Sequence, residues 1–210
     1  MRWFAGMRRV DVLPNGVDGD FFRPMDVAET PHSCVFWGRL DFGPNIQALR
    51  WFCRTVWPAV LHERPDARFT IIGFNPSRTV QDLTQQTGIT IVADLPDLRA
   101  EACRHSVVVL PFVSGGGIKN KLLEAASLGR PIICTPRATG GLRRASVPPV
   151  VLASGSAKWA RELIDLWSDD ARRSRLGHDS RAWVLAHHTW LAAAREAISG
   201  LKSSRLRCAA

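Results

Sequence analysis

The chain has 210 residues, the length of one large domain or of one domain with terminal extensions. Hydrophobic residues make up 46% of it, which excludes a disordered protein, and no apolar run reaches the ~18–20 residues of a membrane-spanning helix. The formal net charge of +9 favours anionic partners: phosphorylated ligands, nucleic acid or an anionic membrane surface.

Short apolar runs alternate with segments of helical periodicity along most of the chain. The apolar runs predict strands at 33–38, 67–73, 89–94, 106–112, 131–135 and 148–153. The spacing between them predicts helices at 45–65, 77–88 and 97–105, and helices again from Ala157 onward, packed on the sheet. This alternation predicts an α/β fold, a Rossmann-like doubly wound parallel sheet with C-terminal helices.

The cysteines and the N-terminus bear on the compartment. The five cysteines are Cys34, Cys53, Cys103, Cys134 and Cys208. Four of them lie in apolar stretches and none forms a CxxC pair, so we expect most of them to be buried thiols in a reducing compartment. The start "MRWFAGMRR" is too short and too charged for a secretory signal. A cytoplasmic location is the simplest expectation.

The stretch "SGGGIKNKLLEAASLGRP", 114–131, follows one predicted strand and precedes another. Its three glycines allow a ligand to approach the backbone, and we expect the following helix to begin near Gly117 or Ile118. The free amides and the dipole at such a helix start suit a phosphate. Lys119 and Lys121 oppose the dipole there, a conflict that an anionic partner removes.

Glu124 stands in the middle of this predicted helix, among leucines and alanines. A carboxylate in such apolar surroundings needs a partner, and a ribose diol offers two donors. A surface glutamate on the polar face explains the spacing equally well. A second glycine-containing turn, "GRLDFGPN" at 38–45, carries Arg39, and two such turns favour a ligand with an extended phosphate. Neither turn matches GxxxxGK[ST] or GxGxxG.

The segments "VLPNGVDGDFFRP", "FWGRLDFGPN", "ARFTIIGFNP" and "SGGGIKNKLLEAASLGRPIICT" occur in an order that resembles family 4 glycosyltransferases of the GT-B fold, in a branch with the GGGIKNKLLEA motif. The terminal "TWLAAAREAI" is similar to that family's last helix, and the resemblance spans about residues 10–200. It implies one half of a GT-B fold, the C-terminal half that binds a nucleotide-diphospho-sugar. It also implies transfer of the glycosyl group with retained configuration.

The resemblance implies roles for individual residues. Arg39 would contact the diphosphate, Glu124 would hold the ribose hydroxyls, and the backbone from Gly117 to Asn120 would meet phosphate and sugar. Arg39 and Lys119 are the implied catalytic cations. The implied donor-binding residues are Gly38, Asn45, Asp94, Leu95, Gly116, Gly117, Ile118, Asn120 and Glu124. No metal ion and no cofactor are expected, because cations and helix amides stabilise the leaving diphosphate.

The sequence departs from the family pattern in three places. Gly116 stands where the family has a glutamate that contacts the donor sugar, and Pro44 and Asn45 stand near the place of a lysine. Lys119 or Lys121 is a candidate to replace that lysine. Only nine residues precede Val10, so the acceptor-binding domain would be encoded separately or be missing. We therefore expect an interdomain-linker remnant at 1–24, a donor-binding domain at 25–188 and a C-terminal helix and tail at 189–210.

Two rival functions stay open from the sequence. A non-catalytic nucleotide-sugar-binding module or inactive remnant is consistent with Gly116 and the short N-terminus. A nucleic-acid-binding protein fits the charge but not the motifs, so no nucleic-acid partner is expected. The arginines at 172, 173 and 175 are interpreted as a solvated helix face. The alternative is that they make peripheral contact with an anionic inner-membrane surface. His187 and His188 are interpreted as surface or C-cap residues, and Trp37 as core or pocket lining.

Overall fold

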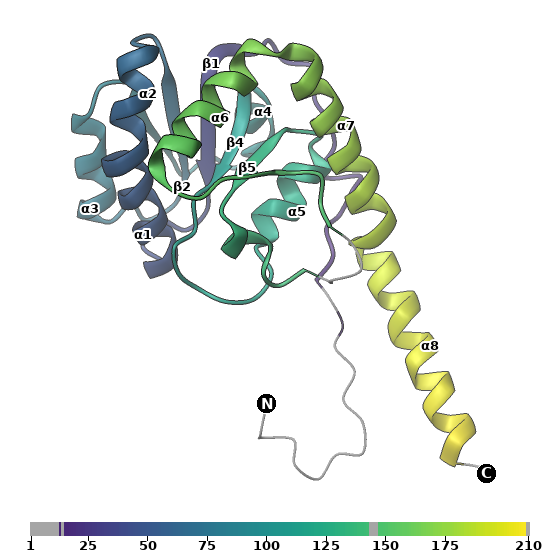
Figure 1. Cartoon of the computed structure of the whole chain (residues 1–210). Coiled ribbons are helices and arrows are strands. Elements are labelled where there is room, and N and C mark those ends of the chain that lie inside the picture. The colour runs from purple at the N-terminus through teal and green to yellow at the C-terminus, as the bar shows by residue number, and fades with distance from the viewer. Residues whose placement is uncertain (1–12, 14, 143–146, 209–210) are drawn as a thin grey trace.

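A computed structural model of the chain describes residues 13, 15–142 and 147–208, with side chains up to residue 200. Six parallel strands form one sheet in the order β3-β2-β1-β4-β5-β6 (Figure 1). The strands are β1 (Thr30–Trp37), β2 (Arg68–Gly73), β3 (Ile89–Ala93), β4 (His105–Leu110), β5 (Ile132–Cys134) and β6 (Val151–Leu152). The predicted doubly wound α/β fold is confirmed, with the reversal of strand order between β1 and β4.

Helices connect these strands and cover both faces of the sheet. One group consists of α1 (Gly43–Trp51), α2 (Trp57–Glu63) and α6 (Ser156–Ser168), which pack together against one face. On the other face α5 (Asn120–Ser127) packs with α7 (Asp170–His187). The remaining helices are α3 (Arg78–Gln81), α4 (Arg99–Cys103) and α8 (Trp190–Cys208), with 3-10 turns at Asp82–Gln85 and Pro136–Thr139.

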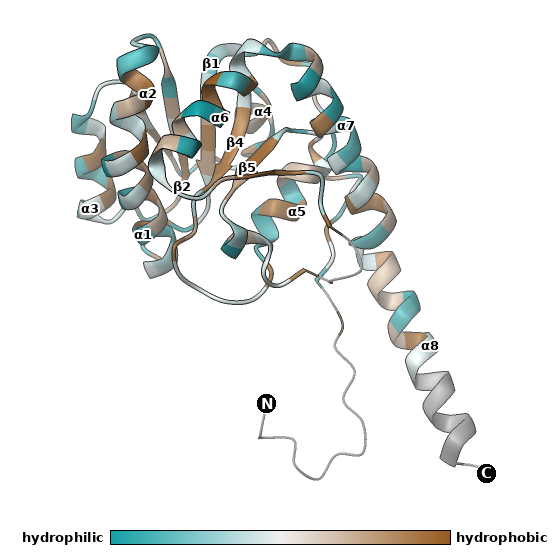
Figure 2. Ribbon diagram, viewed as in Figure 1, coloured by the Kyte–Doolittle hydropathy of each residue, from teal (hydrophilic) through white to brown (hydrophobic). Residues whose placement is uncertain are grey.

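The apolar strands form the centre of the core. Residues 34–37 of β1 and 107–110 of β4 are almost completely buried. In Figure 2 the strands β4 and β5 have the colour of hydrophobic residues. In parallel sheets covered on both faces, strands read as continuous apolar runs rather than alternating ones. Cys34, Cys53, Cys103 and Cys134 are free and buried, as expected, and Cys208 lies outside the residues with described side chains.

The predicted helix 45–65 is divided into three segments. Between α1 and α2 lies a π-helical segment, Phe52–Val56, which ends two residues before Pro58. Proline has no backbone N–H to donate to the preceding turn, and a π segment is a common local adjustment to such a gap. The helix also begins earlier than predicted, at Gly43, and ends at Glu63.

The C-terminal helices correct two expectations. The predicted packing on the sheet holds for α6, but α8 projects away from the domain, with Trp190, Leu191 and Ile198 exposed (Figure 1). His188 is the C-cap of α7, which confirms one of its two interpretations, and because it is only 1% exposed the other, a surface residue, is wrong. None of the helices in the described ranges is long and apolar enough to cross a bilayer.

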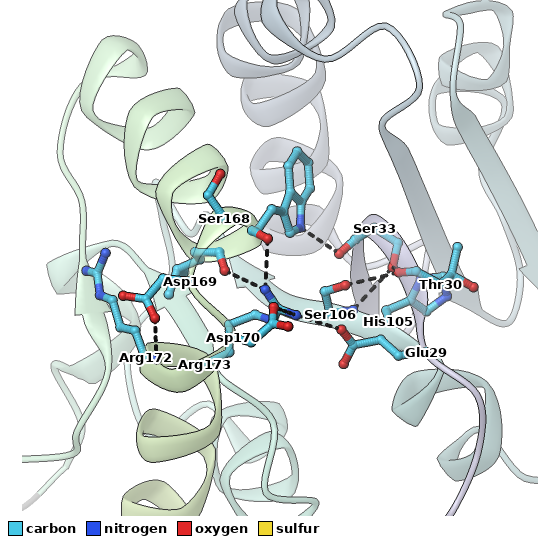
Figure 3. A network of polar contacts seen from close by, with 12 residues as sticks. Glu29, Thr30, Ser33, His105, Ser106, Ser168, Asp169, Asp170, Arg172 and Arg173 are labelled. Atoms are coloured by element: carbon cyan, nitrogen blue, oxygen red, sulfur yellow. Dashed lines mark hydrogen bonds and ion pairs between the residues drawn. The ribbon is translucent and has the colours of Figure 1, made fainter.

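Arg173 is also not part of a solvated face. Its guanidinium donates to the carbonyls of Leu166 and Trp167 at 2.8 and 2.9 Å, and it pairs with Glu29 at 3.1 Å (Figure 3). Arg130 binds the other oxygen of Glu29 at 2.6 Å. This cluster at the amino ends of the strands, which we call the amino-end network, joins α7 to the segment that enters β1.

Candidate functional site

A cavity of about 740 Å³ lies at the carboxyl ends of the strands, where the chain leaves the neighbouring strands β1 and β4. Ligands of open α/β sheets bind at this switch point. Its lining comes from the ends of β1 and β2, from the loops after β3 and β4, and from α5. Most of the residues that we predicted for the site line it: Gly38, Arg39, Asn45, Leu95, Gly116, Ile118, Lys119, Asn120 and Glu124.

Two predicted residues do not line this cavity. Asp94 is exposed in the loop after β3, and its backbone N–H donates to the carbonyl of Gly73 at 3.2 Å. Gly117 instead lines a smaller neighbouring hollow of about 300 Å³, together with Arg137. The structure therefore brings the predicted residues together except at these two positions.

The backbone at the end of β1 and the backbone at the end of β2 approach each other closely beside the cavity. A Cβ atom on Gly73 would lie 1.8 Å from the carbonyl oxygen of Gly38, and one on Gly38 would lie 2.7 Å from Lys121 Nζ. Glycine is therefore required at both strand ends, where the first turn of each βα unit must pass its neighbour. This explains the glycine in "FWGRL" and in "FTIIGF".

The glycine-rich loop adopts a conformation that shifts the helix start. Gly115 and Gly117 have φ of 85° and 71°, which strongly favours glycine, and Lys119 is the extended N-cap residue of α5. The helix thus begins at Asn120, and the predicted start near Gly117 or Ile118 is wrong. No side chain caps α5, and its first turn has no acidic residue, so its N-terminal dipole faces the site uncompensated.

Gly116 differs from its neighbours in the loop. A Cβ atom there would meet nothing within 4 Å, and its φ lies outside the left-handed range. The backbone at this position therefore accepts any side chain. By contrast, a Cβ on Gly141 would lie 2.3 Å from the carbonyl carbon of Gly117, so the segment after β5 braces the loop from behind.

Glu124 points into the cavity from α5 and is not a surface residue. Its Oε2 accepts the indole N–H of Trp37 at 2.7 Å. Burial raises the pKa of this carboxyl, while the Trp37 hydrogen bond and the Lys121 charge act to lower it. Trp37 is 2% exposed and also lines the cavity, so both interpretations of this residue hold.

The two predicted cations, Arg39 and Lys119, differ in their surroundings. Arg39 is exposed and pairs with Asp41 through two hydrogen bonds of 2.9 and 3.1 Å. Lys119 donates to the carbonyl of Gly116 at 2.8 Å, and burial, with a smaller contribution from Arg137, lowers its pKa. Both side chains border the cavity and can approach an anion there.

Asn45 is 4% exposed, and its amide has partners on both sides. Its Nδ2 donates to the carbonyl of Arg39 at 2.7 Å, and its Oδ1 accepts from Lys121 Nζ at 2.8 Å. Near the place where the resemblance implies a lysine, the structure has Asn45 in the first turn of α1, and its side chain accepts a hydrogen bond from Lys121 of α5.

Lys121 also lines the cavity, although the sequence indicates it only as a candidate to replace a lysine of the family pattern. Its ammonium lies 4.4 Å from the ring centre of Phe36 and 5.0 Å from that of Phe112. Burial lowers its pKa to about 7, Glu124 acts to raise it and Lys119 lowers it slightly. Its position three residues before Glu124 is a sequence signal for one helix face, but only the loop geometry reveals the burial.

The loop after β3 and the N-terminal segment form the remaining wall. The guanidinium of Arg99 lies over the ring of Phe21, with 3.7 Å between its Cζ and the ring centre. Asp97 forms an ion pair with Arg99 at 2.6 Å. Asn15 donates to Asn120 at the start of α5 at 3.0 Å. The segment 15–22 thus contributes directly to the site. Within the described ranges, no three His, Cys, Asp or Glu residues form a metal-binding group.

Among curated proteins, two relatives have significant similarity. The D-inositol 3-phosphate glycosyltransferase of Paenarthrobacter aurescens is 29% identical over 233 aligned residues, covering 94% of this chain and 54% of the relative. An uncharacterised 44.6 kDa protein in the cps region of Klebsiella pneumoniae is 24% identical over 144 residues, covering 64% of this chain and 37% of the relative. The chain therefore spans about half or less of the length of these relatives.

Solved structures share the fold at low identity. Sucrose-phosphate synthase from Thermosynechococcus elongatus has a TM-score of 0.72 and 20% identity, over 100% of this chain and 55% of that one. HepE from Anabaena, in complex with UDP and glucose, has a TM-score of 0.70 and 12% identity, over 92% of this chain and 56% of that one. These likenesses show that the Rossmann-like fold of this chain is shared with about half of each of the two structures.

The family model for glycosyl transferases group 1 matches residues 31–169, from β1 to the end of α6. This range contains both glycine-containing turns and the whole of α5, and so nearly all of the cavity lining. The chain belongs to the group 1 glycosyl transferases.

Proposed function

We propose that the cavity binds a nucleotide-diphospho-sugar and that the chain is the donor-binding half of a glycosyltransferase. The supporting observation is the position of Glu124, which points into a deep cavity at the switch point of the sheet and binds Trp37. A carboxylate fixed there is ready to accept two hydroxyl groups, as a ribose diol provides. Membership of the group 1 family and the UDP complex of HepE agree with this choice.

In the proposed complex the nucleotide extends across the cavity. The ribose lies at Glu124 and the base near Leu95, in the loop after β3. The diphosphate lies between Arg39, Lys119 and the uncapped start of α5. Preorganised cations and helix amides stabilise the charge that develops on the leaving diphosphate, without a metal ion.

The reaction proposed for the complete enzyme is transfer of the glycosyl group to an acceptor hydroxyl, with retained configuration. The acceptor-binding part is proposed to lie in a separate domain, because the curated relatives are about twice as long or longer. A cytoplasmic location with peripheral contact to an anionic membrane is part of the same proposal. The limits of the donor domain at 25 and 188 are likewise proposed.

A second candidate function is a non-catalytic nucleotide-sugar-binding module. Gly116 favours it, because no side chain at this position reaches toward the sugar of a bound donor. The open space around its Cβ direction makes Gly116→Glu a clean substitution. The test measures sugar transfer and donor hydrolysis in the presence of the acceptor domain. If the wild type shows neither and Gly116→Glu shows turnover, the wild type is a non-catalytic module.

Calorimetry with UDP-, GDP- and ADP-sugars tests the donor site. We expect one donor class to bind, and Glu124→Ala to weaken it by about 10- to 100-fold, the cost of hydrogen bonds to a charged group. Glu63→Ala, an exposed glutamate on α2, is the matched control and should bind as wild type. Equal affinity of Glu124→Ala and wild type, or no binding of any donor, would refute the assignment.

A further inference from the structure

We propose that Lys121 is the cation that directly contacts the diphosphate of the donor, and that it takes up a proton from solvent as the diphosphate enters. This inference rests on the proposed function and names the protonation event of that same site. It goes beyond the predicted catalytic cations Arg39 and Lys119, because it assigns the direct contact with the diphosphate to the buried amine of Lys121.

The first support is the position of the ammonium group. Lys121 Nζ lies so close to the end of β1 that a Cβ on Gly38 would be 2.7 Å away, and Asn45 Oδ1 holds it at 2.8 Å. The amine therefore lies between the two glycine-containing turns of the sheet, the one after β1 and the one that leads into α5. An extended phosphate that contacts both turns must pass this point.

The second support is the pairing of the other charges. The two arginines that line the cavity each have a carboxylate partner, Asp41 for Arg39 and Asp97 for Arg99. In the part of the chain that the structure describes, neither Lys119 nor Lys121 has an acidic partner within salt-bridge distance. Lys121 has one hydrogen bond, to a neutral amide, so its remaining N–H groups are available for an anion.

The third support is the burial of Lys121, which disfavours the ammonium form in the free protein and lowers the pKa of the amine to about 7. The ring faces of Phe36 from β1 and Phe112 after β4 flank the group and keep water from it, although a ring face by itself attracts a cation. The charged groups that act on it are Glu124, which favours the ammonium, and Lys119, which disfavours it. Asn45, from the first turn of α1, carries no charge.

The direction of the pH effect follows from these surroundings. A diphosphate beside Lys121 favours the ammonium form and raises its pKa above 7 in the complex. Below pH 7 the amine is already charged and binding requires no extra proton. Above pH 7 binding must take up a proton, so affinity falls by up to tenfold per pH unit until the pKa of the complex is reached.

The experiment uses whichever of UDP, GDP and ADP the wild-type chain binds most tightly, together with the matching nucleoside. Calorimetry in buffers of different ionisation enthalpy counts the protons exchanged between pH 7.5 and 9, where the terminal phosphate is fully ionised. For wild type we expect uptake that rises toward one proton for the diphosphate and none for the nucleoside. Heteronuclear NMR of the lysine side chain should show the pKa of Lys121 rising on binding.

Variants separate the role of Lys121 from that of its neighbours. Lys121→Met, which suits the apolar surroundings, should lose at least tenfold in diphosphate affinity and all proton uptake, but bind the nucleoside as wild type. Lys119→Met should lose diphosphate affinity and keep the proton uptake. Lys158→Met, an exposed lysine on α6, is the surface control and should match wild type in both measurements.

Each outcome has one meaning. If Lys121→Met retains diphosphate affinity or proton uptake, or if the NMR titration of wild type shows no shift of Lys121 on binding, the assignment of Lys121 is wrong. That result leaves the donor site intact. If wild type binds none of the three diphosphates, the proposed function itself fails. The wild-type titration decides the question even if Lys121→Met does not fold.

Discussion

The two edges of the sheet use charged residues in opposite ways. In the amino-end network (Figure 3) the guanidinium of Arg173 is saturated by carbonyls and by the carboxylates of Glu29 and Asp170. At the carboxyl edge, Lys121 has a single neutral partner and Glu124 a single hydrogen bond from Trp37. A saturated network stabilises the fold, whereas incompletely paired buried charges cost stability and are available to a ligand.

The pKa directions express the same contrast. Burial acts to raise the pKa of Glu29, but hydrogen bonds and charges, first of all from Arg130, outweigh it and lower the pKa. Burial likewise raises the pKa of Glu124, and there the single Trp37 bond and Lys121 do not outweigh it. The same residue type is therefore stabilised in its charged form at one edge and destabilised at the other.

The largest expected effect is at the amino edge. Arg173→Ala leaves Glu29 and two carbonyls short of a donor, so we expect the free energy of unfolding to fall by about 2–4 kcal/mol. Urea denaturation measures this loss. Arg175→Ala, an exposed neighbour on α7, should change it by less than about 0.5 kcal/mol. Equal losses for the two variants would mean that the network does not hold α7 in place.

Acid should weaken the amino-end network specifically. Because the pKa of Glu29 is lowered in the folded protein, its contribution is present above the ordinary glutamate pKa of 4.5 and is lost as the pH falls through the folded value. We expect wild type to be more stable than Glu29→Gln near pH 7 and the difference to shrink below about pH 4.5. Denaturation midpoints across this range measure it, and a constant difference would contradict the pairing.

At the carboxyl edge the sign should be reversed. Glu124→Gln removes a buried charge whose pKa is raised, and the new amide oxygen can still accept from Trp37. We expect the free energy of unfolding at pH 7 to stay the same or rise by up to ~1 kcal/mol, while donor affinity falls. Thermal denaturation and calorimetry on the same sample check both parts. A clear loss of stability would place Glu124 among the structural residues.

The smallest effect concerns Arg39. Its pair with Asp41 is exposed, and such pairs contribute little to stability. In Asp41→Ala the guanidinium is free for the diphosphate, so we expect nucleotide affinity to rise by about two- to fivefold with stability unchanged. The comparison with Arg39→Ala, in which affinity should fall, is the control. Weaker binding by Asp41→Ala would mean that Asp41 positions Arg39 instead of competing for it.

Periodicity and composition predict the sheet and the two glycine-containing turns with Arg39 and Glu124, because β-branched runs and such turns carry local information. Other site residues, such as Leu95, are expected from the family resemblance. Periodicity and composition do not predict the start of α5, since the positive φ of Gly117 and the extended Lys119 depend on packing against Gly141. They also miss the burial of Lys121, which depends on aromatic rings from two other elements. Arg173 is misjudged for the same reason, because its partners Glu29 and Leu166 lie on other segments.

The indole N–H groups of two tryptophans allow both edges to be observed in one NMR titration. Trp37 donates to Glu124 in the cavity, and Trp167 donates to the carbonyl of Ser33 at 3.1 Å beside the amino-end network. Trp37→Phe and Trp167→Phe assign the two resonances. We predict that adding the preferred nucleoside diphosphate shifts the Trp37 indole signal and leaves that of Trp167 in place. A shift of Trp167 alone, or of neither signal, would contradict a donor site at the carboxyl edge.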